Sequence, residues 1–173
     1  MAEMHIIGQI ESASGFPDSK LFCCWELQYG GGWRLLGGLS EGQSHTDLPV
    51  LEETAYFAHP IDVHLSTRTI QGWPKIHLQI WHQDSYGRQE IFGYSVCQVP
   101  TQPGEQELDC PVWRLCGTFK EEVMSRFVGG GLQTKSLDAI YNSPIKLNTV
   151  AMGSVKLRLG IVLRNFDKFG IQC

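Results

Sequence analysis

Apolar and polar residues alternate with a period of two near the end of the chain. The apolar set is Val155, Leu157, Leu159, Ile161 and Leu163. The intervening set includes Lys156, Arg158, Val162 and Arg164. Side chains of a β-strand point alternately to its two faces, whereas a helix repeats every three to four residues. The pattern therefore predicts a strand with one face in the core and one face outside.

Short segments of the same kind recur along the chain, separated by turns rich in glycine, of which there are 19. The expected strands are 4–10, 22–28, 33–36, 61–65, 75–81, 91–99, 105–110 and 155–164. The segment 105–110 lies between Pro103 and Pro111, which favours an edge strand. No pattern is assigned to 37–59. About eight short strands at regular spacing predict an all-β fold, an antiparallel β-sandwich, in one domain over residues 1–173.

One short helix is expected in a late crossover, at 119–127. Thr118 precedes it and Glu121 follows three residues later, the spacing of a capping box. The apolar stripe comprises Phe119, Val123, Met124 and Phe127. The glycines at 129–131 end the pattern, as glycine commonly does after a helix.

Composition and targeting signals favour a folded protein inside the cell. The chain has 173 residues, of which 42% are hydrophobic, and its net charge is −4. No apolar run is long enough to span a membrane, and the first ten residues lack the features of a secretion signal. The six cysteines contain no Cys-x-x-Cys pair, so we expect free thiols rather than disulfides or a zinc site.

Motifs that carry catalysis are absent from the sequence. It has no Gly-x-Ser-x-Gly elbow, no phosphate-binding glycine loop and no His-Glu-x-x-His. Its six histidines are scattered. Calcium requires six to eight oxygen ligands, yet Asp18 and Asp84 each stand alone in a loop. We therefore expect no enzyme, no metal and no cofactor, and the pI near 5.8 argues against nucleic acid.

Charge is divided unevenly along the chain. Residues 1–112 contain 14 acidic and 5 basic side chains, and residues 113–173 contain 4 acidic and 9 basic ones. Lys156, Arg158 and Arg164 share one face of the last predicted strand. This row suits anionic lipid head groups or an acidic protein surface. The alternative is a solvated strand face whose charges discourage edge pairing.

Five tryptophans are the other signal for a binding surface. Tryptophan is enriched among the residues that dominate protein interfaces. Trp81 falls on the polar face of its strand, and Trp73 opens that strand. We take Trp73, Trp81 and Trp113 as candidate interface residues, with coverage of Trp81 by the helix or a loop as the alternative. Trp25 shares a face with Cys23 and Leu27, which favours the core.

Several motifs resemble the B-nine domain of ciliary transition-zone proteins. The longest is the run 72–81, Gly-Trp-Pro-Lys-Ile-His-Leu-Gln-Ile-Trp. The others are His5–Ile10, Asp84, Gly87-Arg88, Gly93-Tyr94, Val99-Pro100, Pro103-Gly104, Pro111–Arg114, Phe127–Gly131 and Leu163–Asp167. Together they cover nearly the whole chain.

The resemblance implies a sandwich related to the C-two class. It also implies a non-catalytic scaffold subunit of the tectonic-like (Meckel syndrome) complex, with the two other B-nine proteins and tectonic-type membrane proteins as partners. That complex supports cilium assembly and Hedgehog signalling, and limits membrane-protein diffusion between cilium and plasma membrane. The implied location is the cytoplasm and cytoskeleton at the cilium base (basal body and transition zone) and the centrosome, with a link to γ-tubulin. The alternative is a peripheral module that binds anionic lipid without calcium.

Overall fold

The computed structural model describes residues 1–50, 53–115 and 149–170. Nine strands form one antiparallel sheet, in the order β3-β5-β1-β9-β8-β7-β6-β2-β4. Their bounds are β1 Ala2–Ser14, β2 Leu21–Gln28, β3 Trp33–Gly38, β4 Glu41–Gln43, β5 Ala55–Thr67, β6 Lys75–Gln83, β7 Gln89–Gln98, β8 Gly104–Leu115 and β9 Thr149–Arg164. A single 3-10 turn, Phe166–Phe169, follows β9 within the described part of the chain. The predicted all-β antiparallel class is confirmed.

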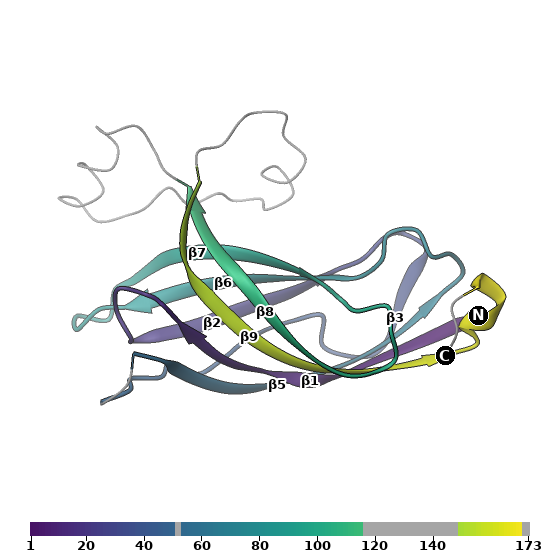
Figure 1. Cartoon of the computed structure of the whole chain (residues 1–173), viewed down its shortest axis with the longest axis horizontal. Coiled ribbons are helices and arrows are strands. Elements are labelled where there is room, and N and C mark those ends of the chain that lie inside the picture. The colour runs from purple at the N-terminus through teal and green to yellow at the C-terminus, as the bar shows by residue number, and fades with distance from the viewer. Residues whose placement is uncertain (51–52, 116–148, 171–173) are drawn as a thin grey trace.

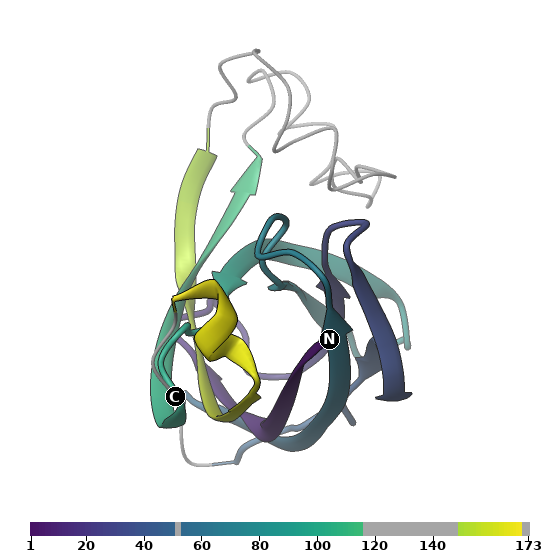
Figure 2. The same cartoon turned by 90° about the vertical axis from the view of Figure 1, so that its right-hand side faces the viewer.

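The sheet curls until its two halves face each other across the interior. β3 and β4 are neighbours along the chain, yet they occupy opposite ends of the sheet. The two-residue link between them therefore passes from one half to the other. Figure 1 shows the long strands crossing the molecule, and Figure 2 shows them surrounding a common interior.

Inward side chains of both halves form one hydrophobic core. The five alternating apolar residues of β9 are all buried, as predicted from their spacing. The inward residues of β6, which are Ile76, Leu78 and Ile80, join them in the same cluster. Burying one side chain of this size stabilises the fold by about 1.5–3 kcal/mol relative to leaving it exposed. The core therefore supplies the main force that holds the sheet curled.

In the sheet order β8 lies between β7 and β9, but the predicted edge segment 105–110 is registered with β9 on one side only, and β8 meets β7 further along, at Trp113. Pro111 is tolerated in β8 because the ladder of pairs between β7 and β8 is short, with Tyr94–Trp113 as its registered pair. Pro111 instead accepts a hydrogen bond at its carbonyl from the Ser95 hydroxyl, 2.7 Å away. Long pairing with β9, from Gly104 to Leu115, keeps the strand in place.

The structure adds one strand, β4, and leaves the predicted helix untested. β4 adds a ninth strand, which the sequence did not predict because three residues are too few to show alternation. The predicted helix at 119–127 lies outside the described residues. In the part of the chain that the structure describes, no helix is long and apolar enough to cross a membrane.

Candidate interaction surfaces

Two of the candidate tryptophans lie on the outer side of the sheet. Trp81 of β6 faces Phe22 of β2 across the strand pair, and their rings stack with centroids 6.1 Å apart. Trp113 of β8 faces Tyr94 of β7, with ring centroids 5.7 Å apart. All four alternate with inward residues and therefore point away from the core. We call these four residues the outer aromatic patch.

The patch is partly covered rather than fully open. Phe22 and Tyr94 are 2% and 3% exposed, although neither belongs to the main core cluster. Trp81 and Trp113 are only partly buried. The Trp81 indole Nε1 donates to the side-chain oxygen of Gln79, 3.2 Å away. The patch thus combines anchored rings with remaining accessible area, a combination typical of interface anchors.

Trp73 lies elsewhere, within an aromatic cluster where β3 and β6 begin and β9 ends. Its ring meets Trp33 edge-on at 5.3 Å between centroids, and Phe166 at 6.0 Å. Its Nε1 donates to the carbonyl of Val99 at 2.8 Å. These contacts give Trp73 a structural role, while a role in partner binding stays a prediction. Sequence reasoning missed Phe166, which is fully buried, because no periodic pattern includes it.

The basic row of β9 lies among carboxylates from both neighbouring strands. Arg158 contacts Glu11 at 2.8 Å, Glu107 at 3.1 Å and Glu105 at 3.7 Å. The structure thus joins this arginine to acids from β1 and β8 on the outer surface. These partners are about 50 to 150 residues away in the sequence, so strand periodicity could not reveal them.

The other two members of the row also have acidic neighbours. Arg164 lies 3.6 Å from Glu3, and Lys156 is registered opposite Asp109. Five carboxylates therefore accompany the three cations on β1, β9 and β8: Glu3, Glu11, Glu105, Glu107 and Asp109. The row forms part of a mixed-charge face with a net negative balance.

The two isolated loop aspartates are engaged with their own surroundings. Asp84 accepts hydrogen bonds from the Arg88 Nε at 2.6 Å and from the amides of Arg88 and Tyr86 at 2.8 and 2.9 Å. Partial desolvation would raise the pKa of Asp84, but these bonds outweigh it and hold the pKa below its ordinary value. Asp18 lies 3.6 Å from His82. Among the described residues no three His, Cys, Asp or Glu side chains form a metal-ligand group.

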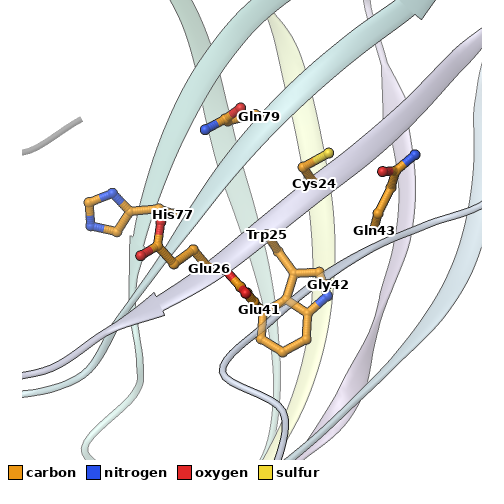
Figure 3. A pocket seen from close by; sticks show the side chains of 8 residues that line it. All are labelled: Cys24, Trp25, Glu26, Glu41, Gly42, Gln43, His77 and Gln79. Atoms are coloured by element: carbon orange, nitrogen blue, oxygen red, sulfur yellow. The ribbon is translucent and has the colours of Figure 1, made fainter. Parts of the chain in front are cut away.

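An open pocket of about 370 Å³ lies where β2, β4 and β6 meet. Its lining, shown in Figure 3, is Cys24, Trp25, Glu26, Glu41, Gly42, Gln43, His77 and Gln79. Burial raises the pKa of the Cys24 thiol. A raised pKa keeps this cysteine in its weakly nucleophilic thiol form, the opposite of what cysteine catalysis requires.

Comparison with known proteins identifies the family of the chain. The sequence model of the family B9-C2, described as "Ciliary basal body-associated, B9 protein", matches residues 4–162. B9 domain-containing protein 2 of Danio rerio is 51% identical over 99% of both chains. The Homo sapiens protein of the same name is 48% identical over the full length of both. The chain belongs to the B9 family.

A more distant B9 protein and one solved structure complete the comparison. B9 domain-containing protein 1 of Mus musculus is 32% identical, covering 62% of this chain and 54% of its own. The C2A domain of plant Extended Synaptotagmin 1 superposes with a TM-score of 0.46 and 12% identity, covering 92% and 93% of the two chains. The B-nine resemblance of the sequence motifs is thus confirmed, and the family description links such chains to the ciliary basal body.

Proposed function

We propose that this B9 protein is a non-catalytic scaffold subunit at the ciliary transition zone, within a tectonic-like complex that supports cilium assembly and limits membrane-protein diffusion. Its direct partners are the two other B9 proteins, and tectonic-type membrane proteins join through the complex. The observation that carries the proposal is the full-length similarity to B9 domain-containing protein 2, in a family described as associated with the basal body.

The geometry of the outer aromatic patch supports a protein partner. Trp81 and Trp113 keep accessible area while neighbouring rings hold them in place. Anchored aromatic side chains lose little conformational entropy on binding, which makes them effective interface anchors. We therefore expect this patch to contact another B9 protein.

The mixed-charge face favours protein scaffolding over direct lipid binding. A basic residue near an anionic membrane contributes about 1 kcal/mol, and nearby carboxylates oppose that attraction. Arg158 has three such carboxylates within 3.7 Å. We expect little sedimentation of the chain with phosphatidylserine vesicles. Reversal of Lys156, Arg158 and Arg164 together to glutamate should leave that sedimentation unchanged. Strong binding that this reversal removes would instead favour the lipid module.

The test of the scaffold role is replacement of the chain in ciliated cells. Loss of the protein should reduce cilium number and let plasma-membrane proteins enter the cilium. Re-expression of the wild-type chain should restore both properties. Normal cilia and a normal barrier without the protein would contradict the proposal.

The variants Trp81→Ala and Trp113→Ala test the surface directly. Each should weaken binding to B9 domain-containing protein 1 of the same organism by about 2 kcal/mol, or roughly thirtyfold. Val162→Ala is the control, since Val162 is exposed on β9, away from the patch. Unchanged affinity in folded variants would remove the patch from the interface.

A further inference from the structure

The segment that contains β4 forms one end of the sheet. It runs along β2 from Ser40 to Asp47 and is bonded to β2 on one side. The amide of Leu27 donates to the Ser40 carbonyl at 2.7 Å, and the amide of Ser44 donates to the Cys23 carbonyl at 2.8 Å. Asp47 exchanges backbone hydrogen bonds with Leu21 near the far end. We call residues 40–47 the open edge.

Alternate residues of the open edge present their backbone outward. In an antiparallel pair, residues bonded to the partner strand alternate with residues whose N–H and C=O point away. Ser40 and Ser44 bond to β2, so Glu41 and Gln43 face the opposite direction. β4 pairs with no strand other than β2 among the described residues. An edge of this kind is a template for another strand.

Exposed apolar side chains lie at both ends of the open edge. Leu36 and Leu39 precede it, and Leu39 is 71% exposed. Leu48 and Val50 follow it, and Val50 is 91% exposed. The Tyr56 amide donates to Asp47 at 2.8 Å, which places an exposed tyrosine of β5 beside that second end. Exposed apolar side chains at both ends of the edge are thus available to contact a partner.

The charge of the open edge favours a basic partner. Residues 40–47 contain Glu41 and Asp47 and no lysine or arginine. Glu26 and Glu41 lie directly opposite each other on β2 and β4, and both line the pocket of Figure 3. Like charges in this position repel each other. A cationic side chain placed between them would relieve that repulsion.

The other end of the sheet lacks these properties. β3 carries a register irregularity between Leu35 and Gly37. Gly38 follows with φ +87°, in the left-handed region, where the backbone leaves the extended conformation of a strand. Bulges and irregular backbone of this kind turn an edge away from further pairing. β4 keeps one register with β2 from Ser40 to Ser44, and the register shifts by one residue only before the Leu21–Asp47 pair.

We propose that the open edge binds an extended, basic segment of a partner protein, which adds to the sheet as a further strand beside β4. This inference rests on the proposed scaffold function and names the mode of one of its contacts. Backbone groups of Glu41 and Gln43 pair with the incoming strand. Its lysine or arginine side chains lie near Glu26 and Glu41, and its apolar residues contact Leu39 and Leu48. The part of the open edge in one register with β2, Ser40–Ser44, measures about 17 Å at 3.4 Å per residue, so the segment needs at least about five residues.

The decisive variant is Gln43→Pro. Proline removes the outward N–H of residue 43 and its ring obstructs an incoming strand, while the bonds of Ser40 and Ser44 to β2 remain. Gln43→Thr is the matched control, because it keeps the N–H and suits a strand. Far-ultraviolet circular dichroism and thermal unfolding establish that both variants fold.

The first probe is B9 domain-containing protein 1 of the same organism, titrated calorimetrically. Gln43→Pro should weaken its binding at least tenfold, and Gln43→Thr less than twofold. Hydrogen exchange should show the amides of Glu41 and Gln43 protected only in the complex. Equal affinity of the wild-type and proline chains, with both amides unprotected, would overturn the inference while leaving the scaffold function intact.

The second probe is a synthetic eight-residue peptide that alternates arginine and valine. It tests the edge even if the wild-type chain fails to bind the B9 partner, an outcome that would count against the scaffold function alone. The peptide should protect the same two amides in the wild-type chain, and Gln43→Pro should abolish the protection of the Glu41 amide. Protection elsewhere on the chain, or none, would contradict strand addition at this edge.

Discussion

Local hydrogen bonds around Asp84 organise the turn between β6 and β7. The carboxylate accepts bonds from two amides and from the Arg88 guanidinium, and only its ionised form satisfies all of them. These bonds hold the pKa of Asp84 below its ordinary value despite partial desolvation. The folded state therefore binds a proton less readily than the unfolded chain does at this residue.

This arrangement predicts a pH-dependent contribution to stability. Because the folded pKa is depressed, the contribution is present above the unfolded pKa, near 4, and is lost as pH falls through the folded pKa. Asp84→Ala should therefore lower the free energy of unfolding at pH 7 and lower it less at pH 3. Urea unfolding at the two pH values measures both differences, with Glu90→Ala on β7 as the control. An equal loss at both pH values would contradict the assignment.

Charged residues illustrate how far single positions could be predicted from the sequence. The alternation placed Lys156, Arg158 and Arg164 on the outer face of the last strand correctly. It could not supply Glu11 or Glu107, because ion pairs between distant strands depend on which strands become neighbours. The electrostatic character of that face thus emerges only from the sheet order.

At the scale of strands, the close pairing of β1 and β9 depends on Gly8. A Cβ added at Gly8 would lie 2.0 Å from the carbonyl oxygen of Arg158 and 2.9 Å from the Cα of Leu159. Both atoms belong to backbone, so they cannot move without displacing the strand. A side chain at this position is therefore incompatible with the observed pairing.

Gly8→Ala should lower the free energy of unfolding by about 3 kcal/mol, in the range of overpacked sites. Gly37→Ala on β3 is the matched control, because no atom lies within 4 Å of its added Cβ. That variant should change stability by less than about 1 kcal/mol. Thermal and urea unfolding of both variants provide the comparison. Similar stabilities of the two would show that β1 and β9 tolerate wider spacing.

The aromatic cluster of Trp33, Trp73 and Phe166 leads to a separate prediction about Trp73. Trp73→Phe keeps an aromatic ring against Trp33 and Phe166 but removes the hydrogen bond to the Val99 carbonyl. We expect a loss of about 1–2 kcal/mol in unfolding free energy. Weaker binding to B9 domain-containing protein 1 beyond the effect of this loss of stability would support the predicted interface role of Trp73, and unchanged binding would contradict it.

Strands were predicted from the sequence where the alternation of apolar and polar residues is long. They were not where the position or conformation of a strand depends on the neighbouring strands. The inward residues of β6 and β9 followed directly from their period of two. The contact of β8 with β7 at Trp113 did not, because it lies beyond the predicted segment 105–110 and its partner lies elsewhere in the chain. β4 has only three residues, Glu-Gly-Gln, and depends on β2 for its extended conformation.

At the scale of the whole molecule, the order of the strands determines which surfaces are available to partners. Curling of the sheet leaves the outer aromatic patch on β2, β6, β7 and β8, and the open edge at β4. The sequence indicated the tryptophans of the patch, but not the edge. An edge is a property of sheet order, and sequence periodicity carries no information on which strand comes last.

Both surfaces lie in the same half of the sheet, since β2 links the patch to β4. We therefore expect the two surfaces to form one interface, in which Trp81→Ala and Gln43→Pro weaken the same contact with B9 domain-containing protein 1. Loss of different partners in the two variants would contradict this arrangement.

Native mass spectrometry of the chain mixed with the two other B9 proteins tests the scaffold function most directly. We expect a complex with one copy of each protein, and loss of at least one component when Trp81→Ala or Gln43→Pro replaces the wild-type chain. Three separate monomers at micromolar concentration, with each protein folded, would contradict the scaffold function.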